Sequence, residues 1–122
     1  MKPMQRLLRP TDFQRVYKNG EAVRNQLLVL HYRKNGEDVC RVGYSVSKRL
    51  GNAVTRNRVK RRLREAMRSM AREIEPGYDL ILSARVRCGS AEYREIVAAV
   101  VNVVTRAGLW QGTITEEEGD GS

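Results

Sequence analysis

The sequence has little of the chemistry from which catalytic and metal sites are built. Its 122 residues include one histidine, His31, and two cysteines, Cys40 and Cys88. The cysteines stand far apart in apolar contexts without metal-ligand spacing, which predicts two buried free thiols in a reducing compartment. A single histidine does not make a nucleophilic triad, and no close pair of carboxylates indicates an acid–base or metal site. We therefore expect this chain to supply neither catalytic residues nor metal ligands.

Long apolar runs are also missing. No segment approaches the roughly 20 apolar residues that a membrane-spanning helix needs, and no signal-peptide core follows Met1. We therefore expect a cytoplasmic protein. The length predicts a single domain, residues 1–115, followed by an acidic disordered tail, residues 116–122.

Acidic residues are scarce beside the basic ones. The chain has 23 Lys and Arg, 14 Asp and Glu, and a formal net charge of +9. Four of the acids lie in the tail, so the preceding residues hold 23 basic and 10 acidic side chains, a formal charge of +13. This excess predicts a polyanionic partner.

Residues 48–64 concentrate the positive charge, with eight basic side chains and no acidic one. A helix is predicted to begin near Val54 or Thr55. Cations would then gather at the positive end of the helix dipole, where anions are favoured. A helix selected only for stability would carry Asp or Glu there. The pattern therefore predicts a surface that binds a phosphate backbone.

The predicted basic helix has two distinct faces. Apolar residues at spacings of three and four predict a buried stripe: Val59, Leu63, Ala66, Met67, Met70 and Ile74. The opposite face carries Asn57, Arg61, Arg64 and Arg68, flanked by Arg58 and Arg62 on one side and by Lys60 on the other. The preference for Arg over Lys favours bidentate contacts with phosphate.

Turn residues and apolar periodicity divide the whole chain into six elements. The first is a helix from Phe13 to about Lys18, capped by Thr11 or Asp12. A strand 22–33 follows, and a turn 34–37 leads into a second strand 39–46 that completes a hairpin. The basic helix then ends at Pro76-Gly77, and a central strand 78–86 and a helix 91–107, stopped by Gly108, complete the chain. The last helix should direct Tyr93, Ile96, Val97, Val100, Val101 and Val104 inward. The order α-β-β-α-β-α predicts an α/β (α+β) two-layer sandwich.

Phe13 and Tyr17 are predicted to lie on one face of the first helix, because they are four residues apart. Two interpretations are open. Both rings can fill the core, or they can form a stacking surface for unpaired bases. The second is favoured by the basic residues expected nearby, which are Arg9, Arg15, Lys18 and Arg24.

Residues 41–65 resemble the signature of the protein subunit of bacterial ribonuclease P. The segment runs from Arg41-Val-Gly-Tyr-Ser-Val-Ser-Lys to Lys60-Arg-Arg-Leu-Arg-Glu65 and contains Arg56-Asn57-Arg58. The pairs Asp12-Phe13 and Val16-Tyr17, with Tyr78-Asp79-Leu80 and Ala84-Arg85, agree in order and spacing. The resemblance covers about residues 5–108.

The resemblance implies an RNA-binding subunit that assists a catalytic RNA in removing the 5′ leader from precursor tRNA, with Mg²⁺ held largely by that RNA. It implies contacts to the RNA subunit from Arg56, Asn57, Arg58, Lys60, Arg61, Arg64 and Arg68, and contacts to the single-stranded leader from Phe13, Tyr17 and His31. It also implies a left-handed β-α-β crossover through the basic helix, in a fold like the second domain of a small-subunit ribosomal protein.

Two other classes of protein fit parts of the pattern. A ribosomal-protein-like binder of rRNA, without a nuclease role, would show the same basic helix and a similar sandwich. A DNA-binding module could place that helix in a major groove. The first gives no reason for an aromatic cleft, and the second usually brings a helix-turn-helix motif that is not visible here.

Overall fold

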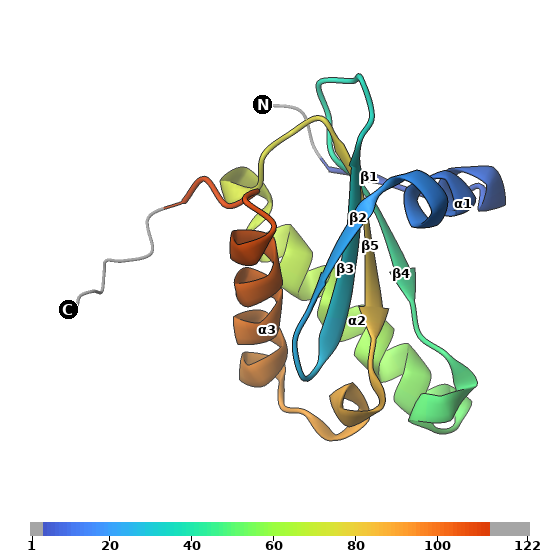
Figure 1. The fold of residues 1–122 in the computed structure, drawn as a ribbon. Coiled ribbons are helices and arrows are strands. Elements are labelled where there is room, and N and C mark those ends of the chain that lie inside the picture. Colours follow the sequence, from blue (N-terminus) through green and yellow to red (C-terminus); the bar gives the residue numbers. More distant parts are fainter. Residues whose placement is uncertain (1–3, 113–122) are drawn as a thin grey trace.

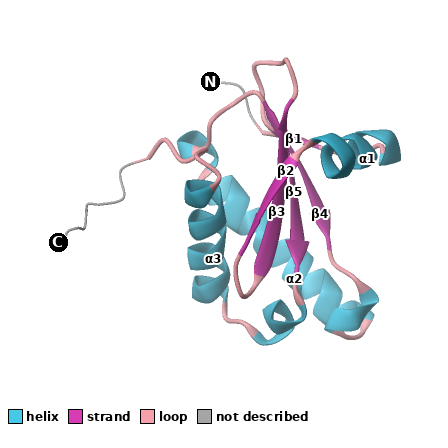
Figure 2. Ribbon diagram, in the orientation of Figure 1, coloured by secondary structure: helices cyan, strands magenta, loops and turns pink. Residues whose placement is uncertain are grey.

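The computed structural model describes residues 4–112, so the predicted acidic tail lies outside the described part of the chain. Within that part the strands form one sheet with helices on both faces (Figures 1 and 2). The elements are, in order, β1 (Gln5–Arg6), α1 (Pro10–Asn19), β2 (Glu21–Arg24), β3 (Leu28–Lys34), β4 (Arg41–Ser45), α2 (Ala53–Ser69), β5 (Tyr78–Ala84) and α3 (Tyr93–Arg106). Short 3-10 turns lie at Lys48–Leu50, Ala71–Glu73 and Val86–Ser90.

Strand β5 is the centre of the sheet, whose spatial order is β1-β4-β5-β3-β2. It pairs in parallel with β4 and antiparallel with β3. Leu80, Ile81 and Leu82 have no exposed surface, as expected of a strand covered on both faces. The prediction of a central strand here is confirmed.

The predicted continuous strand 22–33 is wrong, because the chain turns at Asn25. The backbone N–H groups of Leu27 and Leu28 donate to Asn25 Oδ1 at 3.0 and 2.9 Å, an arrangement that lets an Asn side chain shape a tight turn. Asn25 Nδ2 also donates to the carbonyl of Ala99 on α3 at 3.0 Å. The result is a hairpin of β2 and β3 whose turn is fixed to α3.

The predicted hairpin across residues 34–37 is also wrong, because β5 lies between β3 and β4. Arg33 on β3 and Arg41 on β4 are both register partners of Asp79 on β5, from its two sides. An apolar strand gains most by occupying the middle of the sheet, so the two earlier strands separate to admit it. Strands β4 and β5 with α2 form the expected β-α-β unit of adjacent parallel strands; its left-handed sense stays a prediction.

Helices α2 and α3 cover one face of the sheet over the main core, and α1 lies on the other face (Figure 1). The sandwich of sheet and helices is confirmed, and α1 adds a smaller cluster of Leu7, Val16 and Ile81 on the second face. All six residues of the predicted apolar stripe on α2 and its extension are buried. Tyr93 is an exception on α3, because it is 38% exposed and does not join the core.

Two helix boundaries differ from the prediction. Helix α1 starts at Pro10, not after a cap at Thr11 or Asp12, because proline suits the first turn, where its missing N–H group has no partner to lose. Helix α2 ends at Ser69 and not at Pro76-Gly77, since the chain tightens into the turn Ala71–Glu73 before Ile74 bridges to Trp110.

Cys40 and Cys88 are buried free thiols, as predicted. Burial raises the pKa of Cys40 to about 12 and that of Cys88 to about 11. Both thiols are therefore protonated and act as small apolar side chains.

Candidate nucleic-acid interface

Helix α2 presents the predicted basic face to solvent. Asn52 caps it by accepting a 2.9 Å hydrogen bond from the backbone N–H of Thr55, so the helix starts without any acidic residue in its first turn. Asn57, Arg61 and Arg68 are exposed. Within residues 4–112 none of these three side chains has a hydrogen-bond or ion-pair partner that would hold it to the protein. This face is therefore free to bind an anion.

Two arginines beside this face donate hydrogen bonds to backbone carbonyls within the protein. Arg58 donates from Nη2 to the carbonyl of Gly89 at 3.0 Å, and Arg62 donates from Nη1 to the carbonyl of Ala91 at 3.0 Å. Both carbonyls belong to the segment between β5 and α3. Arg58, which the resemblance assigns to the RNA subunit, thus also joins α2 to the turn before α3.

Two further residues of the predicted group, Arg56 and Lys60, are half-buried on α2. Arg56 donates from Nε to the carbonyl of Gly51 at 3.3 Å, which directs its guanidinium toward the start of the helix. Lys60 is half-buried along the flank of α2. The two side chains widen the positive surface to either side of the exposed row.

A cavity of about 360 Å³ beside the basic face is lined in part by residues that the sequence patterns did not indicate. Arg6 on β1 and Tyr44 on β4 line it together with Arg64 and Arg68 of α2. Burial raises the pKa of Tyr44 to about 12, although the surrounding arginines oppose that change. Tyr44 is therefore a neutral hydrogen-bonding group under the basic face. A two-residue strand such as β1 has no recognisable sequence period, which is why Arg6 was not predicted.

Phe13, Tyr17 and His31 form one aromatic cluster on the other face of the sheet. The ring centroids of Phe13 and Tyr17 are 6.4 Å apart, and those of Tyr17 and His31 are 4.8 Å apart in an edge-to-face arrangement. Such contacts are within the range of favourable aromatic pairs. The structure thus brings together all three residues that were predicted to contact the leader.

The cluster is neither core nor fully exposed. Tyr17 is 44% exposed, whereas Phe13 and His31 are half-buried. The Phe13 ring packs against the small cluster that contains Val16 and Ile81. It is also pressed onto Gly43 of β4, where an added Cβ would lie 2.9 Å from Phe13 Cε2 and closer still to Cζ. Phe13 is therefore neither fully buried in the core nor fully exposed, and its stacking with unpaired bases stays a prediction.

His31 is held in its neutral form. Burial lowers its pKa below the ordinary 6.5, and the positive charge of Arg24 lowers it further. Its Nδ1 atom is buried without a hydrogen-bond partner in the described structure. At neutral pH, His31 is an uncharged ring that can pack with Tyr17.

A buried ion-pair network fixes α1 against the sheet and was missed in the sequence. Arg41 on β4 donates to both oxygens of Asp79 on β5, at 2.8 and 2.7 Å, and approaches Asp12 on α1 at 4.0 Å. Arg9 and Arg15 also pair with Asp12, and the hydrogen bond from Arg9 lowers the pKa of Asp12. The two carboxylates are almost fully buried. The network therefore holds α1, the helix that carries Phe13 and Tyr17, against β4 and β5.

The two candidate surfaces therefore lie on opposite faces of the sheet, the basic face on α2 and the aromatic cluster beneath α1 (Figure 1). In residues 4–112 no group of three or more His, Cys, Asp or Glu side chains is placed to hold a metal ion. No helix in the described part of the chain is long and apolar enough to cross a membrane.

The chain resembles proteins of one family along most of its length. A family model described as Ribonuclease P matches residues 1–108. The ribonuclease P protein component of Clostridioides difficile (strain 630) is 42% identical over 104 residues, which cover 84% of this chain and 91% of that protein. The component of Clostridium novyi (strain NT) is 43% identical over 112 residues, with 90% and 99% coverage.

Solved structures show the same likeness. The RNase P protein of Staphylococcus aureus superposes with a TM-score of 0.81 at 36% identity, covering 86% of this chain and 96% of that one. The RNase P protein of Thermotoga maritima superposes with a TM-score of 0.78 at 29% identity, with 84% and 96% coverage.

Proposed function

Because the chain belongs to the ribonuclease P protein family, we propose that it assists a catalytic RNA in removing the 5′ leader from precursor tRNA. Family membership makes it a subunit of a ribonuclease that works with an RNA partner in tRNA processing. We further propose that the RNA subunit and the leader bind to different surfaces of the protein. The observation that carries it is the separation of a basic helix face from an aromatic cluster on opposite faces of one sheet.

The basic face of α2 would bind the RNA subunit. Its exposed residues Asn57, Arg61 and Arg68 are free of intramolecular partners in the described structure, and Arg64 with Arg6 lines the cavity beside them. Guanidinium groups suit phosphate oxygens because they offer paired donors in a fixed plane. The hydrogen bond from Arg58 to the carbonyl of Gly89 gives Arg58 a second, structural role.

The aromatic cluster would bind the single-stranded leader. Tyr17 has an accessible ring, and Phe13 and His31 form the wall behind it. Unpaired bases stack on such rings with little sequence preference, because every base has a π-face. Exposed Arg15 and Lys18 on α1 can follow the leader phosphates. A binder of folded rRNA alone would leave this cluster without a use.

The chemistry of cleavage is assigned to the RNA subunit. The proposal places Mg²⁺ on the RNA, and this chain would contribute binding and orientation; in residues 4–112 no group of three or more His, Cys, Asp or Glu side chains is gathered. The buried, protonated thiols Cys40 and Cys88 are compatible with a cytoplasmic protein.

Reconstitution with a bacterial ribonuclease P RNA tests this function. The purified chain should stimulate removal of the leader from precursor tRNA at low Mg²⁺, because its cations offset repulsion between the two RNAs. It should cleave nothing by itself. Robust leader removal by the protein without RNA, or no stimulation of the RNA over a range of Mg²⁺ concentrations, would contradict the proposal.

A further inference from the structure

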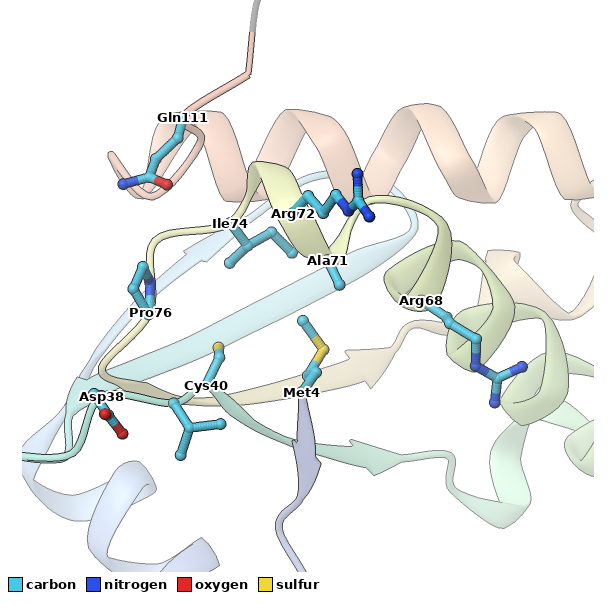
Figure 3. Close-up of a pocket in the computed structure, with 10 residues that line it drawn as sticks. Met4, Asp38, Cys40, Arg68, Ala71, Arg72, Ile74, Pro76 and Gln111 are labelled. Carbon is cyan, nitrogen blue, oxygen red and sulfur yellow. The ribbon is translucent and has the colours of Figure 1, made fainter. Parts of the chain in front are cut away.

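A cavity of about 560 Å³ lies at the carboxyl end of α2, beside the basic face (Figure 3). Its lining has an apolar part, formed by Met4, Val39, Cys40 and Ile74, and a positively charged part, formed by Arg68 and Arg72. The acidic residue Asp38 also lines it. In Figure 3 the side chain of Arg68 and that of Asp38 lie at opposite ends of the cavity. A ligand for this site needs an apolar group and, toward Arg68 and Arg72, negative charge.

The chain's own carboxyl-terminal segment leaves the described structure at this cavity. Glu75 N–H donates to the carbonyl of Leu109 at 2.8 Å, and Gln111 N–H donates to the carbonyl of Glu73 at 2.6 Å. These bonds flank the antiparallel bridge of Ile74 with Trp110. Gln111 itself lines the cavity. If this pairing continued antiparallel, the chain beyond Gly112 would run from Glu73 back toward Arg72 and the end of α2.

Residues 113–118 carry the side chains that the cavity requires. They read Thr-Ile-Thr-Glu-Glu-Glu, with one apolar residue, Ile114, followed by three consecutive glutamates. Ile114 is three residues beyond Gln111, a span of up to about 10 Å in an extended chain. Glu116 to Glu118 follow within a further ~14 Å. The segment therefore offers the apolar group and the negative charges that the two parts of the cavity lining would bind.

We propose that residues 113–118 bind back into this cavity, with Ile114 on the apolar part and Glu116–Glu118 at Arg68 and Arg72. The segment is tethered at the mouth of its own site, so its effective concentration is on the order of millimolar, which makes weak contacts sufficient. Arg68 belongs to the face proposed to bind the RNA subunit. The bound tail therefore masks part of that face and competes with RNA phosphates, a consequence that rests on the proposed function.

Nuclear magnetic resonance of the protein without RNA tests the docking itself. The backbone amide signals of Met4, Arg68 and Arg72 should shift between the full chain and a chain that ends after Gly112. Ile114→Ser should reproduce most of that shift while leaving the charge unchanged, and Thr115→Ser is the matched control that should not. Identical spectra for the full and shortened chains in the region 68–76 would overturn the proposal.

Affinity for a ribonuclease P RNA tests the masking. At low salt both Ile114→Ser and the combined variant Glu116→Gln, Glu117→Gln, Glu118→Gln should bind roughly threefold more tightly than the full chain, because apparent affinity scales with the unmasked fraction. If the tail acted only through its net charge, the RNA affinity of Ile114→Ser would equal that of the full chain, and that result would overturn the masking. If no variant binds the RNA, the proposed function fails, while the spectra still decide the docking. The amide signals of the cavity residues could also shift when RNA is added but stay unchanged when the tail is removed. That result would mean that RNA binds in the cavity and the tail does not.

Discussion

The ring of Phe13 on α1 lies directly on Gly43 of β4, at a distance that leaves no room for a side chain. This contact links the helix to the sheet at the point where the aromatic cluster opens to solvent. The cluster therefore depends on a buried glycine, and a single methyl group added there should disturb it.

We predict that Gly43→Ala displaces Phe13 and weakens binding of the leader. The added Cβ would lie 2.9 Å from Phe13 Cε2, so the ring or α1 must move, at a cost of about 1–3 kcal/mol typical of overpacking. Thermal melting measures this loss. The second variant Phe13→Leu removes the clashing ring atoms, so Gly43→Ala should be better tolerated in that background. Equal melting temperatures for Gly43→Ala and the unmodified chain would refute the packing argument.

We predict that Tyr17→Ala leaves the fold almost unchanged and weakens binding of precursor tRNA. Tyr17 is 44% exposed, so little buried area is lost, whereas base stacking contributes about 1–3 kcal/mol per base. The assembled complex should lose affinity for precursor tRNA with a long leader and keep its affinity for mature tRNA. Tyr93→Ala is the matched control, because Tyr93 is 38% exposed on α3, away from the cluster. Equal effects of the two substitutions would argue against leader stacking.

We predict that Arg61→Ala combined with Arg64→Ala weakens assembly with the RNA subunit. Each lost phosphate contact should reduce the slope of log affinity against log salt by roughly one unit, so the pair should reduce it by about two. The folded state should be retained, because neither guanidinium has an ion-pair partner within residues 4–112. The control Lys34→Ala with Arg94→Ala removes the same charge from exposed positions elsewhere. A salt slope that both double variants change equally would mean that only net charge matters.

We predict that His31 makes the protein less stable as the pH falls below about 6.5. Burial lowers the pKa of His31 in the folded protein below 6.5, so the unfolded chain takes up its proton first and is favoured on acidification. The loss of stability begins near pH 6.5 and continues down to the folded-state pKa. Melting curves of His31→Gln should show a smaller decrease across this range, and the imidazole signals should titrate below 6.5. A titration midpoint above 6.5 would contradict the argument.

Local patterns predicted the parts of the molecule that local spacing determines. The apolar stripe of α2 follows from residues three and four apart, and its buried face fixes the direction in which Arg61 and Arg68 point. The shared face of Phe13 and Tyr17 follows from the same spacing. These features depend on helix geometry alone, so the basic face could be predicted before the fold was known.

Contacts between distant segments could not be predicted in this way. An apolar strand indicates burial on both faces but not its neighbours, so the insertion of β5 between β3 and β4 was missed. The network of Asp12, Arg41 and Asp79 joins three elements and has no sequence spacing. The turn at Asn25 is different, because Asn favours turns and its side chain accepts hydrogen bonds from the backbone of Leu27 and Leu28. The predicted strand 22–33 could therefore have been divided at this residue from the sequence alone.

The central claim is that separate surfaces bind the RNA subunit and the leader. The most direct measurement compares Phe13→Ala with the variant Arg61→Ala, Arg64→Ala in the complex assembled on a ribonuclease P RNA. We predict that Phe13→Ala keeps affinity for the RNA subunit and loses only the preference for precursor over mature tRNA, by about 1–3 kcal/mol per base that it stacks. The arginine variant should weaken assembly and, once assembled at saturating RNA, keep that preference. If each variant reduces both quantities in the same proportion, the two surfaces are not separate and the account is wrong.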